Sequence, residues 1–177
     1  MPGEGFKSEF FGKTLFQAFV EAGRSFGSKE PVLEDAVGTK FSYGRMLIGA
    51  RVLGKRFAKI AQKGEIVPVL LPNANAVVST FLGLQSAGRI PAMLNYTAGP
   101  AVVVSACKTV NAKTVIASRQ FIEKAELKHL QEALEKAGLA FFWLEDVVPN
   151  VGMIEKLMAA VLSKKPIEPT DPNAPAL

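Results

Sequence analysis

A continuous apolar run at residues 65–71 (Glu-Ile-Val-Pro-Val-Leu-Leu) most strongly restricts what this chain can fold into. A strand with one face in water alternates apolar and polar residues, whereas a strand covered on both faces is apolar throughout, as in parallel sheets. Shorter runs of the same character follow at residues 90–94, 114–117 and 139–144. The sequence therefore predicts a buried, mostly parallel sheet. Pro68 fits poorly in its strand, because proline cannot donate a ladder hydrogen bond.

Helical patterns alternate with these runs. Apolar side chains recur at helical spacing in six segments, at residues 14–26, 43–60, 73–87, 100–110, 118–137 and 153–163. Ser42, Ser118 and either Asn73 or Asn75 are suited to cap the helices that follow them. A hairpin from Pro31 to Phe41 precedes the first strand of the sheet. Alternation of this kind predicts an α/β fold with a parallel-rich, doubly wound sheet and flanking helices, joined by right-handed crossovers.

The chain divides into three parts. Residues 1–13 are expected to be a flexible N-terminus, and residues 14–163 to be the α/β subdomain. Proline at every third position from Pro166 to Pro175 predicts an extended linker over residues 164–177. No closing element follows that linker, so we expect this chain to be the front piece of a longer protein.

Composition excludes several classes of protein. With 49% hydrophobic and 21% charged residues, the 177-residue chain is globular. A net charge of +5 without clustered basic and aromatic residues argues against a nucleic-acid partner. Cys107 is the single cysteine, so no internal disulfide forms, and its apolar neighbours predict a buried thiol. The sequence has no secretory signal and no apolar stretch long enough to span a membrane.

Motifs that carry familiar chemistry are absent. No glycine-rich phosphate loop follows a predicted strand, and no serine stands in a nucleophile elbow. His129 is the only histidine, and one histidine with one cysteine cannot build a metal site. The acid pairs Glu34–Asp35 and Glu145–Asp146 could act as acids or bases, but turn and cap roles explain them as well. We assign no catalytic, cofactor-binding or metal-binding residue.

A basic stripe is the most distinctive surface pattern. Arg51, Lys55, Lys59 and Lys63 recur every four residues, opposite an apolar stripe from Met46 to Ile60. Such a stripe is typical of a solvated helix face. It also suits a docking surface for an acidic protein or an anionic membrane, with contacts that weaken as salt is added.

The junctions between strands and helices resemble a known family. Read in order, they are Phe41-Ser42-Tyr43, VPVLLPNANAV, FLGLQSAGRIPAMLNYTAG and TVIASRQFIEKAELKHL. They resemble the N-terminal subdomain of the adenylate-forming (AMP-binding) acyl ligases, where Pro-Asn, Ala-Gly and a short strand with proline follow one another. The stretch GRIPAMLNYTAG, with SRQFIEK and WLED, is most similar to one branch, the acyl-[acyl-carrier-protein] synthetase half of the bifunctional 2-acylglycerophosphoethanolamine acyltransferase. The resemblance covers residues 14–177, except that relatives have a small non-proline residue at Pro68.

The resemblance implies a two-step ligase linked to lysophospholipid reacylation. A fatty acid and ATP give an acyl-adenylate and pyrophosphate, and the thiol of acyl carrier protein then takes the acyl group. ATP and Mg²⁺ are implied for the full-length enzyme. Neither is expected to bind this chain, because the family's phosphate-binding loop follows a stretch like residues 171–177. Asn95, Tyr96 and Thr97 match the family pattern and are expected to support the substrate-pocket wall.

The same resemblance implies partners and a location. The expected partners are the remainder of the ligase domain, acyl carrier protein and the fatty acid, with no nucleic acid. Membrane association is expected only through parts outside this chain, including an acyltransferase half before Met1. The implied location is the cytoplasm or the cytoplasmic face of the bacterial inner membrane. Two alternatives stay open, namely coenzyme A as the acceptor and a non-catalytic module that docks an acidic partner through the basic helix.

Overall fold

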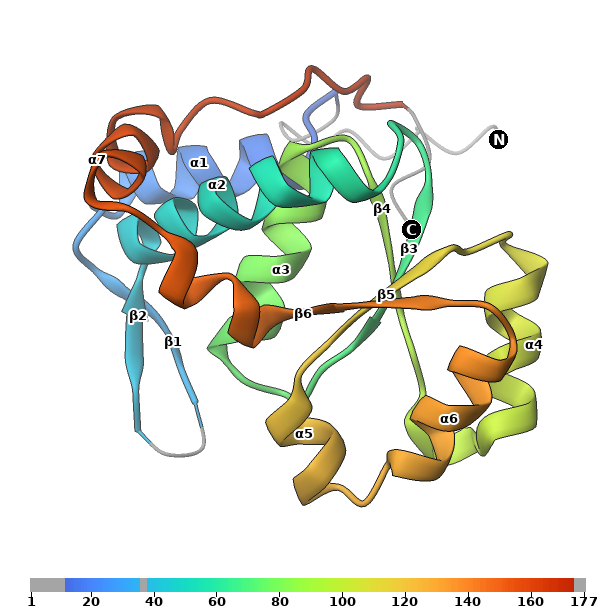
Figure 1. The fold of residues 1–177 in the computed structure, drawn as a ribbon. Helices are drawn as coiled ribbons and strands as arrows, with labels where there is room; N and C mark the ends of the chain where they lie inside the picture. The colour runs from blue at the N-terminus through green and yellow to red at the C-terminus, as the bar shows by residue number, and fades with distance from the viewer. Residues whose placement is uncertain (1–11, 36–37, 174–177) are drawn as a thin grey trace, which may run out of the picture.

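The computed structural model describes residues 12–35 and 38–173, so residues 1–11 of the expected flexible N-terminus and residues 174–177 of the expected linker lie outside it (Figure 1). Its helices and strands, in chain order, are α1 (Leu15–Ser25), β1 (Pro31–Glu34), β2 (Lys40–Ser42), α2 (Tyr43–Ile60), β3 (Ile66–Leu70), α3 (Asn75–Ser86), β4 (Ile90–Met93), α4 (Pro100–Thr109), β5 (Thr114–Ala117), α5 (Arg119–Lys124), α6 (Lys128–Lys136), β6 (Ala140–Trp143) and α7 (Met153–Leu162). Short 3₁₀ helices, η1 (Tyr96–Ala98), η2 (Leu144–Asp146) and η3 (Val148–Asn150), follow β4 and β6. No helix in the described part is long and apolar enough to cross a membrane.

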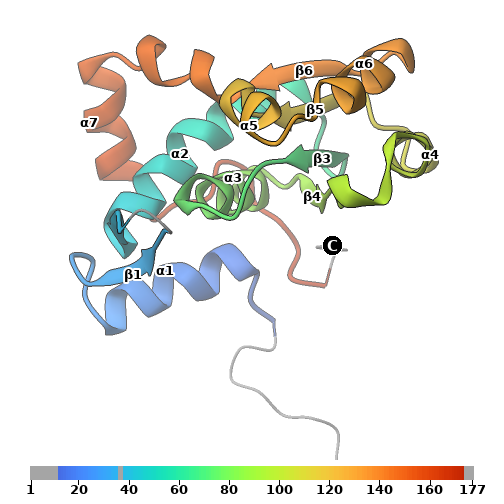
Figure 2. The same ribbon diagram turned by 90° about the horizontal axis from the view of Figure 1, so that it is seen from below.

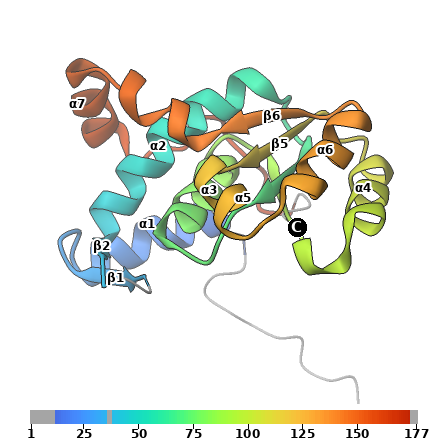
Figure 3. The ribbon, with the colours of Figure 1, turned by 60° about the horizontal axis from the view of Figure 1, so that its bottom comes forward.

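The sheet confirms the predicted fold class. Its strand order is β4-β3-β5-β6, and all three neighbouring pairs are parallel. The hairpin β1–β2 forms a separate antiparallel pair. It lies with α1 at the end of the molecule away from α4 (Figure 3). From β3 the chain turns first to β4 on one side and then crosses to β5 on the other, so the order reverses between β3 and β5.

Helices cover both faces of the sheet because its central strands are apolar on both faces. Val67, Val69 and Ile116 pack with Phe57 of α2 and Leu84 of α3. The alternate residues of the strands, Leu70, Val115 and Ala117, pack against α4, α5 and α6 instead. Figure 1 shows these two groups of helices on opposite sides of the strands. Cys107 is buried in the second cluster, as predicted, and burial raises the pKa of its thiol.

Successive residues of a strand point their backbone N–H and C=O groups to opposite neighbouring strands. This alternation decides which side Pro68 and Pro91 face. Ile90 donates its N–H to Glu65 and Leu94 donates to Val69, so the odd-numbered residues of β3 pair with β4. Pro68 therefore faces β5, and pairing with β5 begins only at Val69. On β4 the even-numbered residues pair with β3, which turns Pro91 toward the open edge of the sheet. Pro91 therefore removes no ladder hydrogen bond and blocks that edge from pairing further, whereas the missing N–H of Pro68 limits the β3–β5 ladder to residues from Val69 onward.

One predicted helix is wrong. Residues 118–137 form two helices, α5 and α6, rather than one. The break lies at Glu126, whose φ of 54° is left-handed, and Leu127 donates its N–H back to Ile122 at 2.8 Å. Ile122 and Leu127 are both buried. Five residues apart on one continuous helix, they would point about 140° away from each other, so the break lets both reach the core.

The predicted caps are confirmed at two helices and wrong at a third. The hydroxyls of Ser42 and Ser118 accept hydrogen bonds from the third residues of α2 and α5. Helix α3 has Ala74 at its N-cap without a side-chain hydrogen bond. Asn75 is instead buried and donates from Nδ2 to the Thr39 carbonyl at 2.7 Å and to Asp35 Oδ2 at 3.2 Å. It ties α3 to the hairpin because its side chain points toward the hairpin and away from its own helix.

Helices α2 and α3 approach each other unusually closely. A Cβ atom on Gly54 would lie 2.8 Å from the Gly83 carbonyl oxygen and 2.8 Å from Ser86 Oγ. A Cβ atom on Gly83 would in turn lie 3.1 Å from the Ala50 carbonyl oxygen. Glycine weakens an isolated helix. At these positions it lets two helix backbones touch, so the tertiary contact explains the glycines in α2.

Candidate functional site at the carboxyl edge of the sheet

The carboxyl ends of β3, β4, β5 and β6 all lie at one edge of the sheet, because the strands are parallel. In open α/β sheets, ligands bind at this edge, beside the point where the strand order reverses. That point lies between β3 and β5 here. The segments that follow the four strands are therefore the candidate site.

Asn95, Tyr96 and Thr97, the predicted pocket-wall residues, follow β4 at this edge and are exposed. Asn95 Oδ1 accepts hydrogen bonds from the Thr97 N–H at 3.2 Å and from the Thr97 hydroxyl at 2.7 Å, which closes η1. The Tyr96 ring stands edge-to-face on Phe121 of α5, with 5.3 Å between centroids. The tyrosine thus links the segment after β4 to the helix after β5.

Two pairs of side chains link the segment after β5 to the segment after β6. The Ser118 hydroxyl donates to Glu145 Oε1 at 2.6 Å, and the Gln120 N–H donates to the same oxygen at 3.2 Å. The two terminal nitrogens of Arg119 donate to the two carboxylate oxygens of Asp146, at 2.6 and 2.9 Å. The Arg119 guanidinium also lies 4.8 Å from the centroid of the Trp143 ring. These contacts hold the edge in one shape.

The two acids of this edge are charged at neutral pH. Burial raises the pKa of Glu145, but hydrogen bonds from Ser118 and from backbone amides outweigh it, so that pKa lies below its ordinary value. The hydrogen bond from Arg119 lowers the pKa of Asp146. A general base is most effective with a pKa near the working pH. The geometry therefore suits positioning and binding better than proton transfer by either carboxylate.

Nothing in the described part fits a metal or nucleotide phosphates. Residues 12–35 and 38–173 contain no group of three or more His, Cys, Asp or Glu side chains that could hold a metal ion. His129 is exposed on α6, with Nδ1 near the Glu126 carbonyl oxygen. The residues present do not match the oxygen cage of Mg²⁺ or a phosphate-binding loop. The described residues therefore offer no site for Mg²⁺ or for the phosphates of ATP.

Two residues of the basic stripe, Arg51 and Lys63, bind the described part of the segment that follows α7, and the other two do not. Arg51 donates to the Lys165 and Pro166 carbonyl oxygens at 2.9 and 3.2 Å, and burial lowers the pKa of its guanidinium. Lys63 donates to the Pro169 carbonyl oxygen. Lys55 and Lys59 lie instead beside Glu155 of α7, whose pKa is lowered first by its hydrogen bond to Arg56 and further by these two charges. The structure thus gives the four stripe residues two different neighbours.

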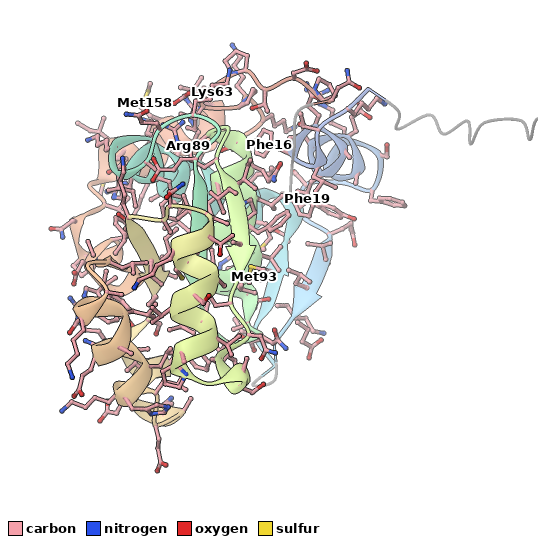
Figure 4. The ribbon with its side chains drawn as sticks, turned by 90° about the vertical axis from the view of Figure 1, so that its right-hand side faces the viewer. Phe16, Phe19, Lys63, Arg89, Met93 and Met158 are labelled. Atoms are coloured by element: carbon pink, nitrogen blue, oxygen red, sulfur yellow. The ribbon has the colours of Figure 1, made fainter. Side chains whose placement is uncertain are left out.

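Residues 164–173, part of the predicted linker, contact α2 and α3. The Ile167 and Glu168 N–H groups both donate to the Ser86 carbonyl oxygen, at 2.7 and 3.0 Å. The carboxylate of Glu168 pairs with Arg89, which is buried. The segment runs across α2 toward the far end of the molecule (Figure 1), where Lys63 and Arg89 lie near each other (Figure 4). The sequence offered no signal for this contact, because the segment carries only a proline pattern.

Glu145→Gln is expected to make the free energy of unfolding fall less steeply as the pH is lowered from 7 to 3. A carboxylate with a lowered folded-state pKa stabilises the fold above its unfolded pKa of about 4, and this contribution is lost as the pH falls through the folded pKa. We expect urea unfolding between pH 7 and pH 3 to show a steeper loss for the wild-type chain than for the variant. Glu132→Gln, on the exposed face of α6, is the matched control. Equal slopes for wild type and Glu145→Gln would contradict the assigned role.

Comparison with known proteins finds similarity to CoA ligases in sequence and to several solved structures in fold. No family profile matches the chain. In sequence it is 28% identical over 102 residues to the 4-coumarate–CoA ligase of Vanilla planifolia, a match that covers 57% of this chain and 18% of that protein. The 4-coumarate:CoA ligase 1 of Petunia hybrida is likewise 28% identical over 102 residues, covering 57% of this chain and 19% of the relative. The chain thus spans less than a fifth of the length of these curated relatives.

Solved structures agree on the fold. VinN superimposes with a TM-score of 0.71 over 93% of this chain and 39% of its own, at 18% identity. A benzoate CoA ligase from Burkholderia xenovorans LB400 gives 0.61 over 76% of this chain and 28% of its own, at 22% identity. The fatty acyl CoA synthetase of Mycobacterium tuberculosis gives 0.58 over 91% and 29%, at 15% identity. The fold is that of the N-terminal domains of adenylate-forming enzymes, and the sequence is similar to that of 4-coumarate–CoA ligases.

Proposed function

From this relationship to CoA ligases we propose that the chain is the N-terminal subdomain of an ATP-dependent ligase. Such a ligase converts a carboxylic acid and ATP to an acyl-adenylate and pyrophosphate, and then transfers the acyl group to a thiol with release of AMP. The observation that carries the proposal is the sequence similarity to 4-coumarate–CoA ligases, supported by a fold shared with a benzoate CoA ligase. ATP and Mg²⁺ belong to this proposal as needs of the whole enzyme.

The role proposed for this chain is structural support of the site. Its carboxyl edge carries ionised, hydrogen-bonded acids and a braced aromatic pair, Tyr96 and Phe121. Groups of this kind hold a surface rigid. We propose that Asn95, Tyr96 and Thr97 form part of the wall on which the remainder of the ligase domain closes over the acid.

The acceptor thiol is proposed to be coenzyme A, with acyl carrier protein as the alternative. Coenzyme A is supported by the names of the curated relatives, all of which are CoA ligases. Acyl carrier protein, together with a fatty acid substrate and lysophospholipid reacylation, is supported only by the resemblance of GRIPAMLNYTAG, SRQFIEK and WLED to the acyl-[acyl-carrier-protein] synthetase branch. Docking of acyl carrier protein on the basic helix would rest mainly on Lys55 and Lys59, because Arg51 and Lys63 contact residues 165–169.

Pyrophosphate exchange tests the proposed function. The purified 177-residue chain is expected to give no ATP–pyrophosphate exchange with palmitate or 4-coumarate, because its described residues hold no phosphate-binding loop. The product of the gene read beyond codon 177 is expected to give exchange with at least one of these acids. Adding coenzyme A or acyl carrier protein then identifies the acceptor by which thioester forms. Robust exchange by the 177-residue chain, or none by the longer product, would contradict the proposal.

A further inference from the structure

Helix α7 has its apolar face toward solvent. Five large aliphatic side chains of this helix are 46–87% exposed, namely Met153, Ile154, Leu157, Met158 and Val161. The polar residue Glu155 points inward and binds Arg56 of α2 through both carboxylate oxygens, at 2.5 and 3.0 Å. Ala159 is the only buried residue of the helix. A surface helix of a globular protein is normally oriented the other way.

The exposed side chains form one continuous surface. At 100° per residue, the five aliphatic residues and Ala160 fall within an arc of about 160° that contains no charged or hydrogen-bonding side chain. The helix lies at the margin of the molecule beside α2 (Figure 2), and Met158 stands at that outer margin (Figure 4). An exposed apolar patch of this kind marks an interaction surface. It is convex, because it follows the outside of a helix.

Lysines border this apolar arc. Lys156 lies on its flank by helical position, and Lys164 and Lys165 follow the end of the helix, all three exposed. Lys55 and Lys59 belong to α2, the helix to which Glu155 is bound through Arg56, and their charges add to the lowering of the Glu155 pKa. Glu155 is the one acid of the helix, and it is already paired with Arg56. The surface around the arc is therefore cationic, in a chain of net charge +5.

We propose that α7 binds an anionic phospholipid surface, with its aliphatic arc inserted among the acyl chains and the bordering lysines against the headgroups. A helix with one aliphatic face and lysine flanks matches the chemistry of an interfacial helix, and each lysine adds attraction to an anionic leaflet. A protein partner is a poorer fit, because the arc offers no polar group to fix an orientation. The flexible side chains of Met153 and Met158 can adapt to an irregular, fluid surface.

Vesicle flotation with the 177-residue chain tests this proposal. We expect the chain to float with vesicles of phosphatidylcholine and phosphatidylglycerol, and much less with phosphatidylcholine alone. Leu157→Ser combined with Val161→Ser is expected to weaken binding about tenfold or more, since two aliphatic anchors are lost. Lys156→Gln with Lys164→Gln is expected to weaken binding to anionic vesicles about severalfold and to reduce its dependence on salt.

Val102→Ser is the matched control, because Val102 is an aliphatic residue of α4 that is 58% exposed and lies away from α7. It should leave binding unchanged. Unchanged circular dichroism of each variant shows that the fold is retained. The proposal is overturned if the wild-type chain does not float, or if the Leu157 and Val161 variant floats as well as wild type. It is also overturned if the face is instead covered by a second copy or by acyl carrier protein, which sedimentation of the chain alone and with that protein would reveal.

Discussion

Arg89→Ala is expected to lower the free energy of unfolding by about 3–5 kcal/mol, the usual cost of breaking a buried charge pair. Arg89 is only 4% exposed. Its guanidinium donates to the Ala61 carbonyl oxygen at 2.6 and 3.0 Å and to the Ala58 carbonyl oxygen at 3.1 Å. It also binds the Ala87 carbonyl and the carboxylate of Glu168. Removing it leaves several buried acceptors without a donor.

The position of Arg89 explains why the loss is large. Ala61 is the C-cap of α2 and Ala87 the C-cap of α3, so one cation satisfies carbonyls at the ends of both helices. A positive charge at a helix C-terminus is favourable in itself. Glu168 belongs to the segment after α7, and its ion pair with Arg89 fastens that segment to the same place. The side chain thus joins three parts of the chain that are distant in sequence.

Urea unfolding at pH 7 measures the effect, with Arg119→Ala as the control. Arg119 also forms a two-nitrogen pair with a carboxylate, that of Asp146, but on the surface. Exposed pairs contribute about 1 kcal/mol or less. Arg89→Lys is expected to recover only part of the stability, because an ammonium group cannot reach as many acceptors in a fixed plane. Equal losses for Arg89→Ala and Arg119→Ala would show that Arg89 does not hold these elements together.

Gly54→Ala is expected to destabilise the protein by about 1–3 kcal/mol, the range for overpacking a tight contact. Alanine stabilises a helix interior by about 1 kcal/mol relative to glycine, so an isolated α2 would gain from this change. In the folded protein the new Cβ atom meets the Gly83 carbonyl oxygen and Ser86 Oγ, each at 2.8 Å, and Ile167 Cγ1 at 3.2 Å. A backbone oxygen cannot move aside without shifting α3. The steric cost therefore outweighs the helix propensity.

Gly152→Ala is the matched control for Gly54→Ala. A Cβ atom on Gly152 meets no atom within 4 Å, and its φ of −67° suits any residue. Its effect on the free energy of unfolding is expected to stay within about 1 kcal/mol, the cost of alanine in place of glycine at the N-cap of α7. Thermal and urea unfolding of the two variants give the comparison. A Gly54→Ala protein as stable as wild type would show that α2 and α3 separate at little cost.

Much of the fold could be predicted from local patterns. The run at residues 65–71 predicted a strand covered on both faces, and β3 has helices on each side. The serine caps at Ser42 and Ser118 form as predicted, since a cap depends on groups three residues apart. The junction residues likewise resembled those of adenylate-forming enzymes, and the comparisons agree at the level of fold and of CoA ligase similarity.

The candidate site was predicted less completely. Asn95, Tyr96 and Thr97 were expected at the pocket wall, and the structure puts them at the carboxyl edge of the sheet. Their role there stays a prediction. The contacts of Arg119 with Asp146 and of Ser118 with Glu145 were missed, although both acids had been noted. Each contact joins residues 27 positions apart, which a strand–helix pattern does not relate.

The sequence alone determined where most of the helices and strands lie, although not the break between α5 and α6, because hydrophobic period, caps and breakers act over a few residues. Only the tertiary structure decided how α2 and α3 meet through Gly54 and Gly83, why Arg89 is buried, and which way α7 faces. These features depend on atoms brought together from residues 28 to 115 positions apart. Local propensity contains no information about such pairs. Burial and hydrogen bonding between distant segments supply it.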